Sequence, residues 1–279
     1  MVKLTVLAEN SVGVSFGQVA EHGWSVLLED GERRVLFDTG QGACLKTNPG
    51  LLGKDLSRLD AIVLSHGHYD HTKGLLQVLE GCGGTEVYCH PRALETKKVR
   101  RSLAGREINL SIGLPFTKAQ LEAQGARFRL LTEPTAVTPQ ITASGEIPLV
   151  TEFETIEPGF LVENDQGESP DPFADDLALF VRTEKGLSVI LGCAHRGVIN
   201  TLRAAAAWAG TDRFFALIGG NHLHSRSAEQ VDKTLAALES LSFQIIAPAH
   251  CTGQKVAAKI FERFGERAVP CSVGTQMEL

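Results

Sequence analysis

Short apolar runs bounded by turn residues occupy the first third of the chain and predict β-strands. These runs are residues 4–7, 24–28, 34–37, 61–64 and 86–89. The second and third runs are joined by residues 29–32, a short loop containing Asp-Gly, which is a hairpin signal. Residues 73–79, after the fourth run, suggest a helix. The first part of the chain is therefore expected to be rich in β-structure.

The second half alternates strands with helices. Strands are predicted at residues 177–181, 187–191, 214–218 and 243–247, and helices through 200–205 and over 228–241. Such alternation is typical of α/β domains, and no part of it has the composition of a linker. We therefore expect residues 1–279 to form a single domain.

Two central segments interrupt this pattern. Residues 93–124 change character, with a helix-like part at 118–123, and predict an insertion that covers the core. Residues 133–172 are punctuated by Pro and Gly and predict loops and short strands able to cover a site. The first segment also carries a basic stretch, Lys97, Lys98, Arg100, Arg101 and Arg106. This stretch is interpreted either as a solvated charged face or as a binding site for a substrate phosphate.

Size and charge narrow the classes of function. The chain has 279 residues, 43% of them hydrophobic and 22% charged, which is enough to bury a substantial core. Its formal net charge of -6 argues against a nucleic-acid-binding surface, although a metal site can still attract anions locally. We expect a small-molecule substrate, and a phosphorylated one stays open.

Neither a membrane nor an oxidising compartment is expected. No apolar run approaches the roughly 20 residues that span a bilayer, and the start of the chain lacks the apolar core and cleavage site of a signal peptide. The six cysteines form no C-x-x-C pair, which favours free thiols in a reducing environment. Together these features predict a cytoplasmic protein.

The densest chemical signal is an H-x-H-x-D-H run that begins just after the strand predicted at 61–64. His66, His68, Asp70 and His71 place three imidazoles and a carboxylate within six positions. Zn²⁺, Mn²⁺ and Fe²⁺ accept both kinds of ligand, and the run has enough donors for two adjacent ions. Surface histidines followed by a helix N-cap at Asp70 would leave this clustering unexplained. We interpret the run as part of a dinuclear metal centre, with Zn²⁺ expected and Mn²⁺ or Fe²⁺ as alternatives.

Three further histidines follow predicted strands. His195, His222 and His250 each lie just past an apolar run, where loops converge on one edge of an open sheet. The repeated placement marks His195 and His250 as candidate ligands, and His222 as a candidate catalytic residue that binds substrate or acts as a general acid. His22 precedes a strand instead, so structural, supporting and substrate-binding roles all stay open for it.

Two cysteines lie close to these candidates. Cys193 is two residues before His195, and Cys251 directly follows His250. A thiolate beside a metal ion can ligate it, and a small buried cysteine is the alternative. The chain contains no P-loop and no G-x-S-x-G motif, so neither a nucleotide-binding loop nor a serine nucleophile is predicted.

These motifs resemble those of the metallo-β-lactamase superfamily. The H-x-H-x-D-H run matches, and so does the strand-terminal aspartate, Asp38 in LFDTG. The segments EHG, LSHGHYDHT, IGLP, SGEIP, GCAH, GGNHL and HCTG are similar to the subgroup named for 7,8-dihydropterin-6-methyl-4-(β-D-ribofuranosyl)aminobenzene 5′-phosphate synthase. The resemblance implies a four-layer αβ/βα sandwich of the α/β class, with two mixed sheets, outer helices and metals along one sheet edge.

The resemblance also implies two sets of ligands: His66, His68 and His195 for one ion, and Asp70, His71 and His250 for the other. The strand that usually ends in Gly-Asp, whose carboxylate bridges the metals, ends here in Gly192-Cys193. The bridging position is therefore open to Cys193, Asp176 or water, with a turn-capping role as the alternative for Asp176. His195 is a further candidate for the bridging region, in place of the usual third-histidine position. Asp38 and His22 are further candidates to bridge or to support the ligands.

Three functions follow from the resemblance. The first is hydrolysis of an ester or phosphoester by a metal-activated water, in which Asp70 would position one metal and could shuttle a proton. The second is the condensation that names the subgroup, in which the metals would stabilise oxyanions but water would not attack. The third is a non-enzymatic sensor of a metal or ligand, which the intact ligand motif disfavours.

Overall fold

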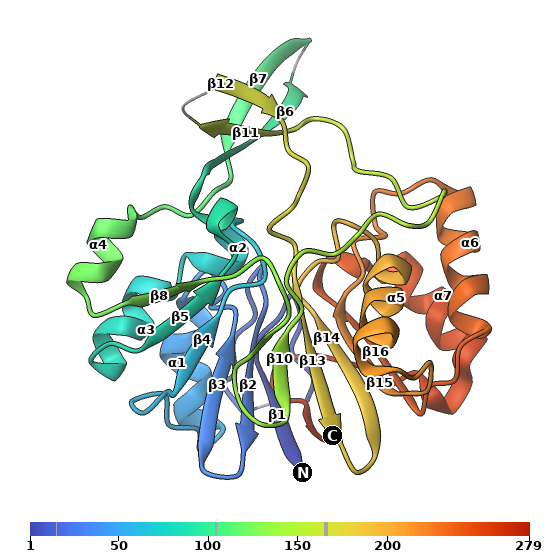
Figure 1. The fold of residues 1–279 in the computed structure, drawn as a ribbon, viewed down its shortest axis with the longest axis horizontal. Coiled ribbons are helices and arrows are strands. Elements are labelled where there is room, and N and C mark those ends of the chain that lie inside the picture. The colour runs from blue at the N-terminus through green and yellow to red at the C-terminus, as the bar shows by residue number, and fades with distance from the viewer. Residues whose placement is uncertain (15, 104, 165–166) are drawn as a thin grey trace.

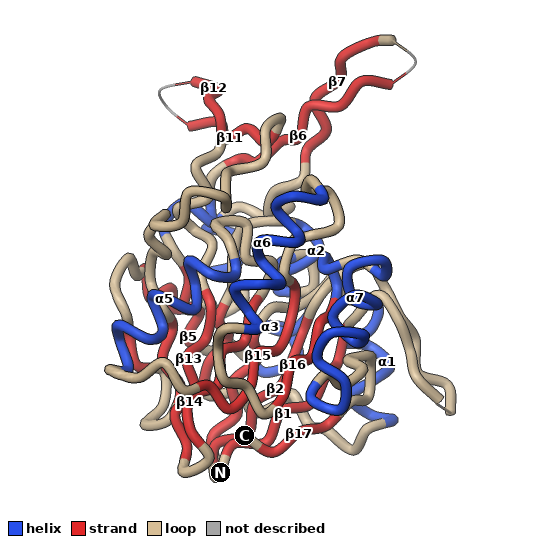
Figure 2. Tube along the Cα trace, turned by 90° about the vertical axis from the view of Figure 1, so that its right-hand side faces the viewer, coloured by secondary structure: helices blue, strands red, loops and turns tan. Residues whose placement is uncertain are grey.

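Two mixed sheets packed face to face, with helices on their outer faces, form the body of the molecule (Figure 1). The computed structural model describes residues 1–14, 16–103, 105–164 and 167–279. A third, smaller sheet projects from one end of the sandwich (Figure 2). None of the helices in the described part of the chain has the length and apolar character needed to cross a membrane. The expected α/β sandwich is confirmed.

The first sheet has seven strands in the order β17-β1-β2-β3-β4-β5-β8. These are β1 (Val2–Ala8), β2 (Ser25–Asp30), β3 (Arg33–Phe37), β4 (Ala61–Val63), β5 (Glu86–Cys89), β8 (Arg127–Leu130) and β17 (Gln276–Glu278). Strands β3, β4, β5 and β8 run parallel, whereas β17, β1, β2 and β3 pair antiparallel. Its outer face is covered by α1 (Ala43–Leu51), α3 (Leu75–Cys82) and α4 (Lys118–Ala123).

The second sheet has six strands in the order β16-β15-β14-β13-β10-β9. These are β9 (Thr135–Ala136), β10 (Ile141–Ala143), β13 (Ala178–Thr183), β14 (Gly186–Leu191), β15 (Phe214–Gly220) and β16 (Ile245–Ala249). Strands β14, β15 and β16 run parallel. Its outer face is covered by α5 (Val198–Ala209), α6 (Ala228–Glu239) and α7 (Gln254–Phe264).

Both faces of each large sheet are buried. Val26 and Leu28 of β2 pack in the core between the sheets, whereas Leu27 faces the helices. In β14, Ile190 points into the inter-sheet core and Val189 toward the helices of its own side. Side chains alternate across a strand, and covering both faces favours apolar residues at most positions. This explains why the strands are continuous apolar runs in the sequence.

The projecting sheet has four antiparallel strands in the order β12-β11-β6-β7. They are β6 (Thr96–Leu103), β7 (Arg106–Ser111), β11 (Phe160–Asn164) and β12 (Gly167–Pro170). The segment 93–124, expected as one covering insertion, therefore divides between this sheet and α4, which packs on the first large sheet. The Pro- and Gly-rich segment supplies β9 and β10 of the second large sheet as well as β11 and β12.

Candidate metal centre

The candidate ligands gather at one edge of the sandwich, where strands of both large sheets end. The loop after β4 and the short helix α2 (Tyr69–Thr72) carry His66, His68, Asp70 and His71. His195, His222 and His250 follow β14, β15 and β16 of the other sheet. Parallel strands place their carboxyl ends at the same edge, which is where open α/β sheets bind ligands. Residues far apart in the sequence are thereby brought together.

Four residues beside this edge have a left-handed backbone. The φ angles of Asp38, Ala194, His222 and His250 are 60°, 57°, 46° and 48°. Such angles cost of the order of 1–3 kcal/mol in a residue with a side chain, and they cluster at functional sites. Here they turn the chain sharply just after β3, β14, β15 and β16. The strain is concentrated where the candidate ligands meet.

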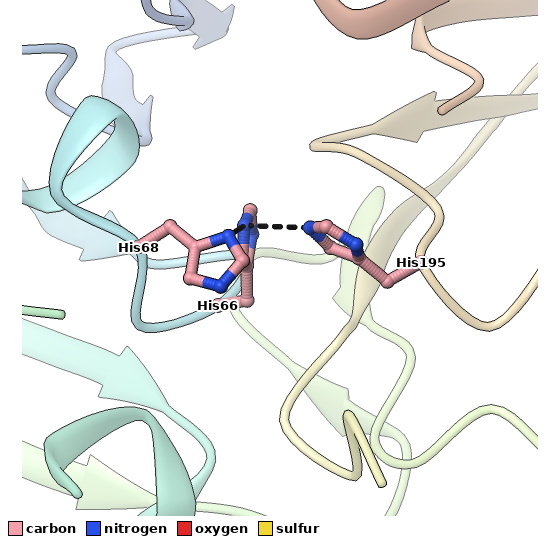
Figure 3. Close-up of side chains that lie close together, drawn as sticks. All are labelled: His66, His68 and His195. Carbon is pink, nitrogen blue, oxygen red and sulfur yellow. Dashed lines mark hydrogen bonds between the residues drawn. The ribbon is translucent and has the colours of Figure 1, made fainter. Parts of the chain in front are cut away.

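His66 lies between two other imidazoles (Figure 3). Its Nε2 atom is 3.0 Å from Nδ1 of His68 and 3.3 Å from Nε2 of His195. Burial lowers the pKa of His66 and His195 well below the usual value, and lowers that of His68 to about 3. All three rings are therefore neutral at pH 7, which is the form that binds a metal ion. Their converging nitrogens fit a single cation.

Asp38 holds two of the histidines in place. Its Oδ2 atom lies 2.7 Å from the Ser65 hydroxyl and 2.7 Å from Nδ1 of His71. Because the Ser65 hydroxyl donates to Asp38, it accepts from Nδ1 of His66 at 2.9 Å. Both imidazoles thereby direct Nε2 toward the site, as metal-binding histidines do when their other nitrogen is hydrogen-bonded. Asp38 thus orients ligands without facing the site itself.

The second group of predicted ligands also converges. Nε2 of His250 is 3.2 Å from Nε2 of His71 and 3.3 Å from Oδ2 of Asp70. Burial opposes ionisation of Asp70, but His71 and hydrogen bonds from His22 and His250 hold its pKa well below the usual range. Burial also acts to lower the pKa of His71, yet Asp38 and Asp70 raise it to about 9. Without a metal ion His71 is therefore protonated at pH 7, and it would release that proton on binding one. An anionic oxygen among imidazoles is a donor set suited to a divalent ion.

His22 joins the second group from a separate loop. Its Nε2 atom lies 3.2 Å from Oδ2 of Asp70, and its ring centroid is 5.0 Å from that of His250. Asp70 does not cap a long helix, because it lies inside α2 and α3 begins only at Leu75. Its carboxylate instead contacts the side chains of His22 and His250.

Cys193 lies between the two groups. Its Sγ atom is 3.2 Å from Nε2 of His71. Possible ligand atoms within 4.8 Å of that sulfur belong to both groups and to their neighbours: His66, His71, His195, His222, His250 and Cys251. Asp176 is placed differently, because its Oδ2 accepts a hydrogen bond from the backbone of Arg196 at 2.9 Å and it joins no such group among the described residues. The geometry favours Cys193 over Asp176 as a bridging side chain.

His222 is held by a carboxylate that the sequence did not reveal. Its Nε2 atom lies 2.9 Å from Oε2 of Glu157, which also accepts from the Ser225 hydroxyl at 2.7 Å. Burial acts to lower the pKa of His222, but hydrogen bonds with Cys251 and Glu157 raise it to about 9. Glu157 follows no strand and belongs to no motif, so only the fold identifies it. His224, which also carries no sequence signal, lines the cavity above the candidate metal centre together with His222.

The centre opens into a cavity of about 210 Å³. One side of it is lined by Cys193, Asp70 and five of the histidines introduced above, and the other by side chains of the projecting sheet, Val99, Arg101 and Phe160. The five histidines are His22, His68, His195, His222 and His250. Phe160 stacks on His68 with ring centroids 5.6 Å apart. The projecting sheet therefore shapes the entrance to the candidate metal centre.

Comparisons with known proteins identify a matching family and a similar sequence. Residues 33–169 match the family described as the Beta-lactamase superfamily domain. The 7,8-dihydropterin-6-methyl-4-(beta-D-ribofuranosyl)-aminobenzene-5′-phosphate synthase of Methanocaldococcus jannaschii is 31% identical over 277 residues, which cover 95% of this chain and 92% of that protein.

Solved structures are similar over the whole chain. Tm1679, described as a metal-dependent hydrolase of the beta-lactamase superfamily, superimposes with a TM-score of 0.84 at 30% identity, covering 100% of this chain and 99% of that one. The Zn²⁺-bound PqqB of Methylobacterium extorquens gives a TM-score of 0.59 at 14% identity, covering 99% and 100%. The second similarity is one of fold alone.

Proposed function

Because the chain belongs to the metallo-β-lactamase superfamily, in the subgroup of the pterin-type synthase, we propose that it is a metal-dependent hydrolase of an ester or phosphoester. The observation that carries this proposal is the meeting of two ligand groups across Cys193 beside one cavity. A purely structural role would not require neutral imidazole nitrogens to face one another.

The proposed cofactor is a pair of divalent ions. His66, His68 and His195 would hold one ion, and Asp70, His71 and His250 the other, with Cys193 between them. Such ions supply Lewis acidity, which stabilises a developing oxyanion and lowers the pKa of water. Zn²⁺ suits this mixture of nitrogen, oxygen and sulfur donors, and Fe²⁺ or Mn²⁺ remain alternatives.

Asp70 and His222 are the proposed catalytic residues. The carboxylate of Asp70 is ionised at pH 7 and lines the cavity, where it can position an ion and accept a proton. His222 also lines the cavity, and its pKa of about 9 keeps it protonated at pH 7. It can therefore donate a proton to a leaving oxygen, while Glu157 holds its ring in place.

The test combines metal analysis with an activity screen. Protein purified without added metal should hydrolyse at least one ester, phosphomonoester or phosphodiester, and chelation should remove the activity. His68→Ala and Asp70→Asn should abolish turnover while the fold is retained. Asp232→Asn, which changes an exposed carboxylate on α6, is the matched control. Wild-type activity of both site variants in metal-depleted buffer would contradict metal-assisted hydrolysis.

A second candidate is condensation of a pterin with a ribofuranosyl-aminobenzene phosphate. The 31% identity to the synthase over 95% of this chain supports it. The same residues would then stabilise oxyanions without attack by water. Supplying both condensation partners in the screen separates the reactions, because condensation consumes a pterin and hydrolysis does not. Metal binding without any turnover would favour a sensor instead.

The proposed setting is cytoplasmic, with a small-molecule substrate. All six cysteines are free thiols, which supports a reducing compartment. The cavity of about 210 Å³ suits part of a small molecule better than a macromolecular surface.

A further inference from the structure

The basic stretch divides according to the two faces of β6. Side chains alternate along a strand, so Lys97, Val99 and Arg101 share one face. Val99 and Arg101 both line the cavity above the metal centre. Lys97 is buried, and its Nζ atom lies 2.7 Å from Asp171 and 2.9 Å from Asp175. Since those carboxylates neutralise Lys97, Arg101 is the cation that this face offers to the cavity.

The cations of the opposite face are also paired. Nζ of Lys98 lies 2.7 Å from Oε2 of Glu163, and Nη2 of Arg100 lies 3.0 Å from Oε1 of Glu168. Arg106, at the start of β7, is exposed and does not line the cavity. A solvated charged face therefore describes Lys98 and Arg100 well, but it does not describe Arg101.

Arg101 is held over an aromatic ring at the mouth of the cavity. Its Cζ atom is 5.6 Å from the centroid of Phe160, and Phe160 lies opposite Val99 in the β6–β11 pair. Among the residues that the structure describes, no carboxylate lies within ion-pair distance of Arg101. A guanidinium has a planar fork of donors that matches carboxylate and phosphate groups. An available guanidinium above a stacked ring is suited to an anion on an apolar scaffold.

We propose that Arg101 binds an anionic group of the substrate that is separate from the reacting bond, with Phe160 packing against the apolar or aromatic part between them. The position of the reacting bond at the metal centre rests on the proposed function. The substrate class is accordingly a small molecule with a ring, a reactive group at one end, and a carboxylate or phosphate at the other. In a chain of net charge -6, such a local cation also offsets general repulsion of anions.

The test uses two non-hydrolysable probes, phenylphosphonate and 4-carboxyphenylphosphonate, titrated calorimetrically into metal-loaded protein. Both offer a phosphonate to the metal centre, and only the second has another anion. The wild type should bind the second probe about 10-fold more tightly, the size expected of a charge-assisted hydrogen bond. Arg101→Gln should lose this preference. Arg100→Gln, on the opposite face of the same strand, should keep it.

Three results would overturn the role of Arg101. These are an unchanged preference in Arg101→Gln, an equal loss of affinity for both probes, or an equal loss of preference in Arg100→Gln. Thermal unfolding of each variant checks that the exposed substitution leaves the fold intact. The outcome is independent of turnover. A wild type that hydrolyses nothing can still prefer the second probe. If the wild type is an active hydrolase but shows no such preference, only the role of Arg101 is contradicted and the proposed function stands.

Discussion

Sγ of Cys193 lies 3.2 Å from Nε2 of His71, so a thiol stands at the junction of the two ligand groups. In the superfamily pattern that the chain resembles, this strand end supplies a carboxylate instead. Burial and the neighbouring Cys251 raise the pKa of Cys193 well above its usual value, which keeps a metal-free thiol protonated. A coordinated metal ion removes such a proton. A thiolate ligand in place of a carboxylate favours softer ions such as Zn²⁺ and Fe²⁺ over Mn²⁺.

We therefore expect Co²⁺-substituted protein to show a sulfur-to-cobalt charge-transfer band in the near ultraviolet. Cys193→Ser should lose the band, because serine offers no thiolate. Cys44→Ser, which changes a buried cysteine outside the ligand groups, should keep it. Loss of the band in Cys251→Ser alone would assign the sulfur ligand to Cys251 and contradict the bridging role of Cys193.

Metal content tests the dinuclear centre directly. Elemental analysis of fully loaded protein should find about two equivalents of transition metal, as two sets of three protein ligands predict. His195→Ala should retain about one equivalent, because the second group does not include His195. A fully loaded wild type with a single equivalent would disprove the pair.

Loss of His222 should impair turnover more than metal binding. We expect His222→Ala to keep both metal equivalents and to lose activity about 100-fold, the size typical of a lost proton-transfer group. The measurements are kcat and elemental analysis on the same preparation. Loss of one metal equivalent would make His222 a ligand instead, and unchanged kinetics would leave it a structural residue.

Glu157 should contribute, together with Cys251, to the alkaline limit of activity. Burial opposes the charged form of His222, but hydrogen bonds with Cys251 and Glu157 raise its pKa to about 9. A general acid must be protonated, so kcat should fall as the pH rises through this value. Glu157→Gln removes the negative partner and should move that fall to lower pH. The same pH profile in Glu157→Gln and wild type would exclude this coupling.

Lys97 should be important for stability. Lys97→Met leaves Asp171 and Asp175 buried without their cation, and loss of one partner of a buried pair costs about 3–5 kcal/mol of unfolding free energy. Lys98→Met, on the exposed face, should cost far less, because an ion pair in contact with water contributes little to stability. Denaturant unfolding at pH 7 measures both. Equal effects of the two substitutions would contradict a structural role for Lys97.

The cost of Lys97→Met should also depend on pH. Burial opposes ionisation of Asp175, but Lys97 lowers its pKa below the usual 3.8. A lowered carboxyl pKa contributes stability that is present above the unfolded value and lost as the pH falls through the folded value. The difference between wild type and variant should therefore shrink below about pH 4. A difference that grows toward acid would contradict this sign.

Local patterns in the sequence determined much of the fold and the floor of the site. The central strands of the two large sheets are buried on both faces, so each of them is a short apolar run that can be recognised alone. The edge strands β8, β9 and β17 are partly exposed and form no such run, and the sequence did not locate them. The run of candidate ligands from His66 to His71 lies in one continuous segment, the loop after β4 and helix α2, and the strand ends before His195 and His250 mark those residues as candidates as well. The observed bounds of these strands differ little from the predicted ones. For example, the strand predicted at 243–247 is observed as β16, Ile245–Ala249.

The tertiary structure decided which distant residues meet. The projecting sheet pairs β6 with β11, and its exposed strands alternate polar and apolar residues too irregularly to be recognised before their partners are known. Glu157 acquires its role only because the fold carries it to His222, and Arg101 differs from Arg100 only in the face of β6 that it occupies. Contacts across long sequence separations depend on the packing of whole layers, and no short window of sequence contains that information.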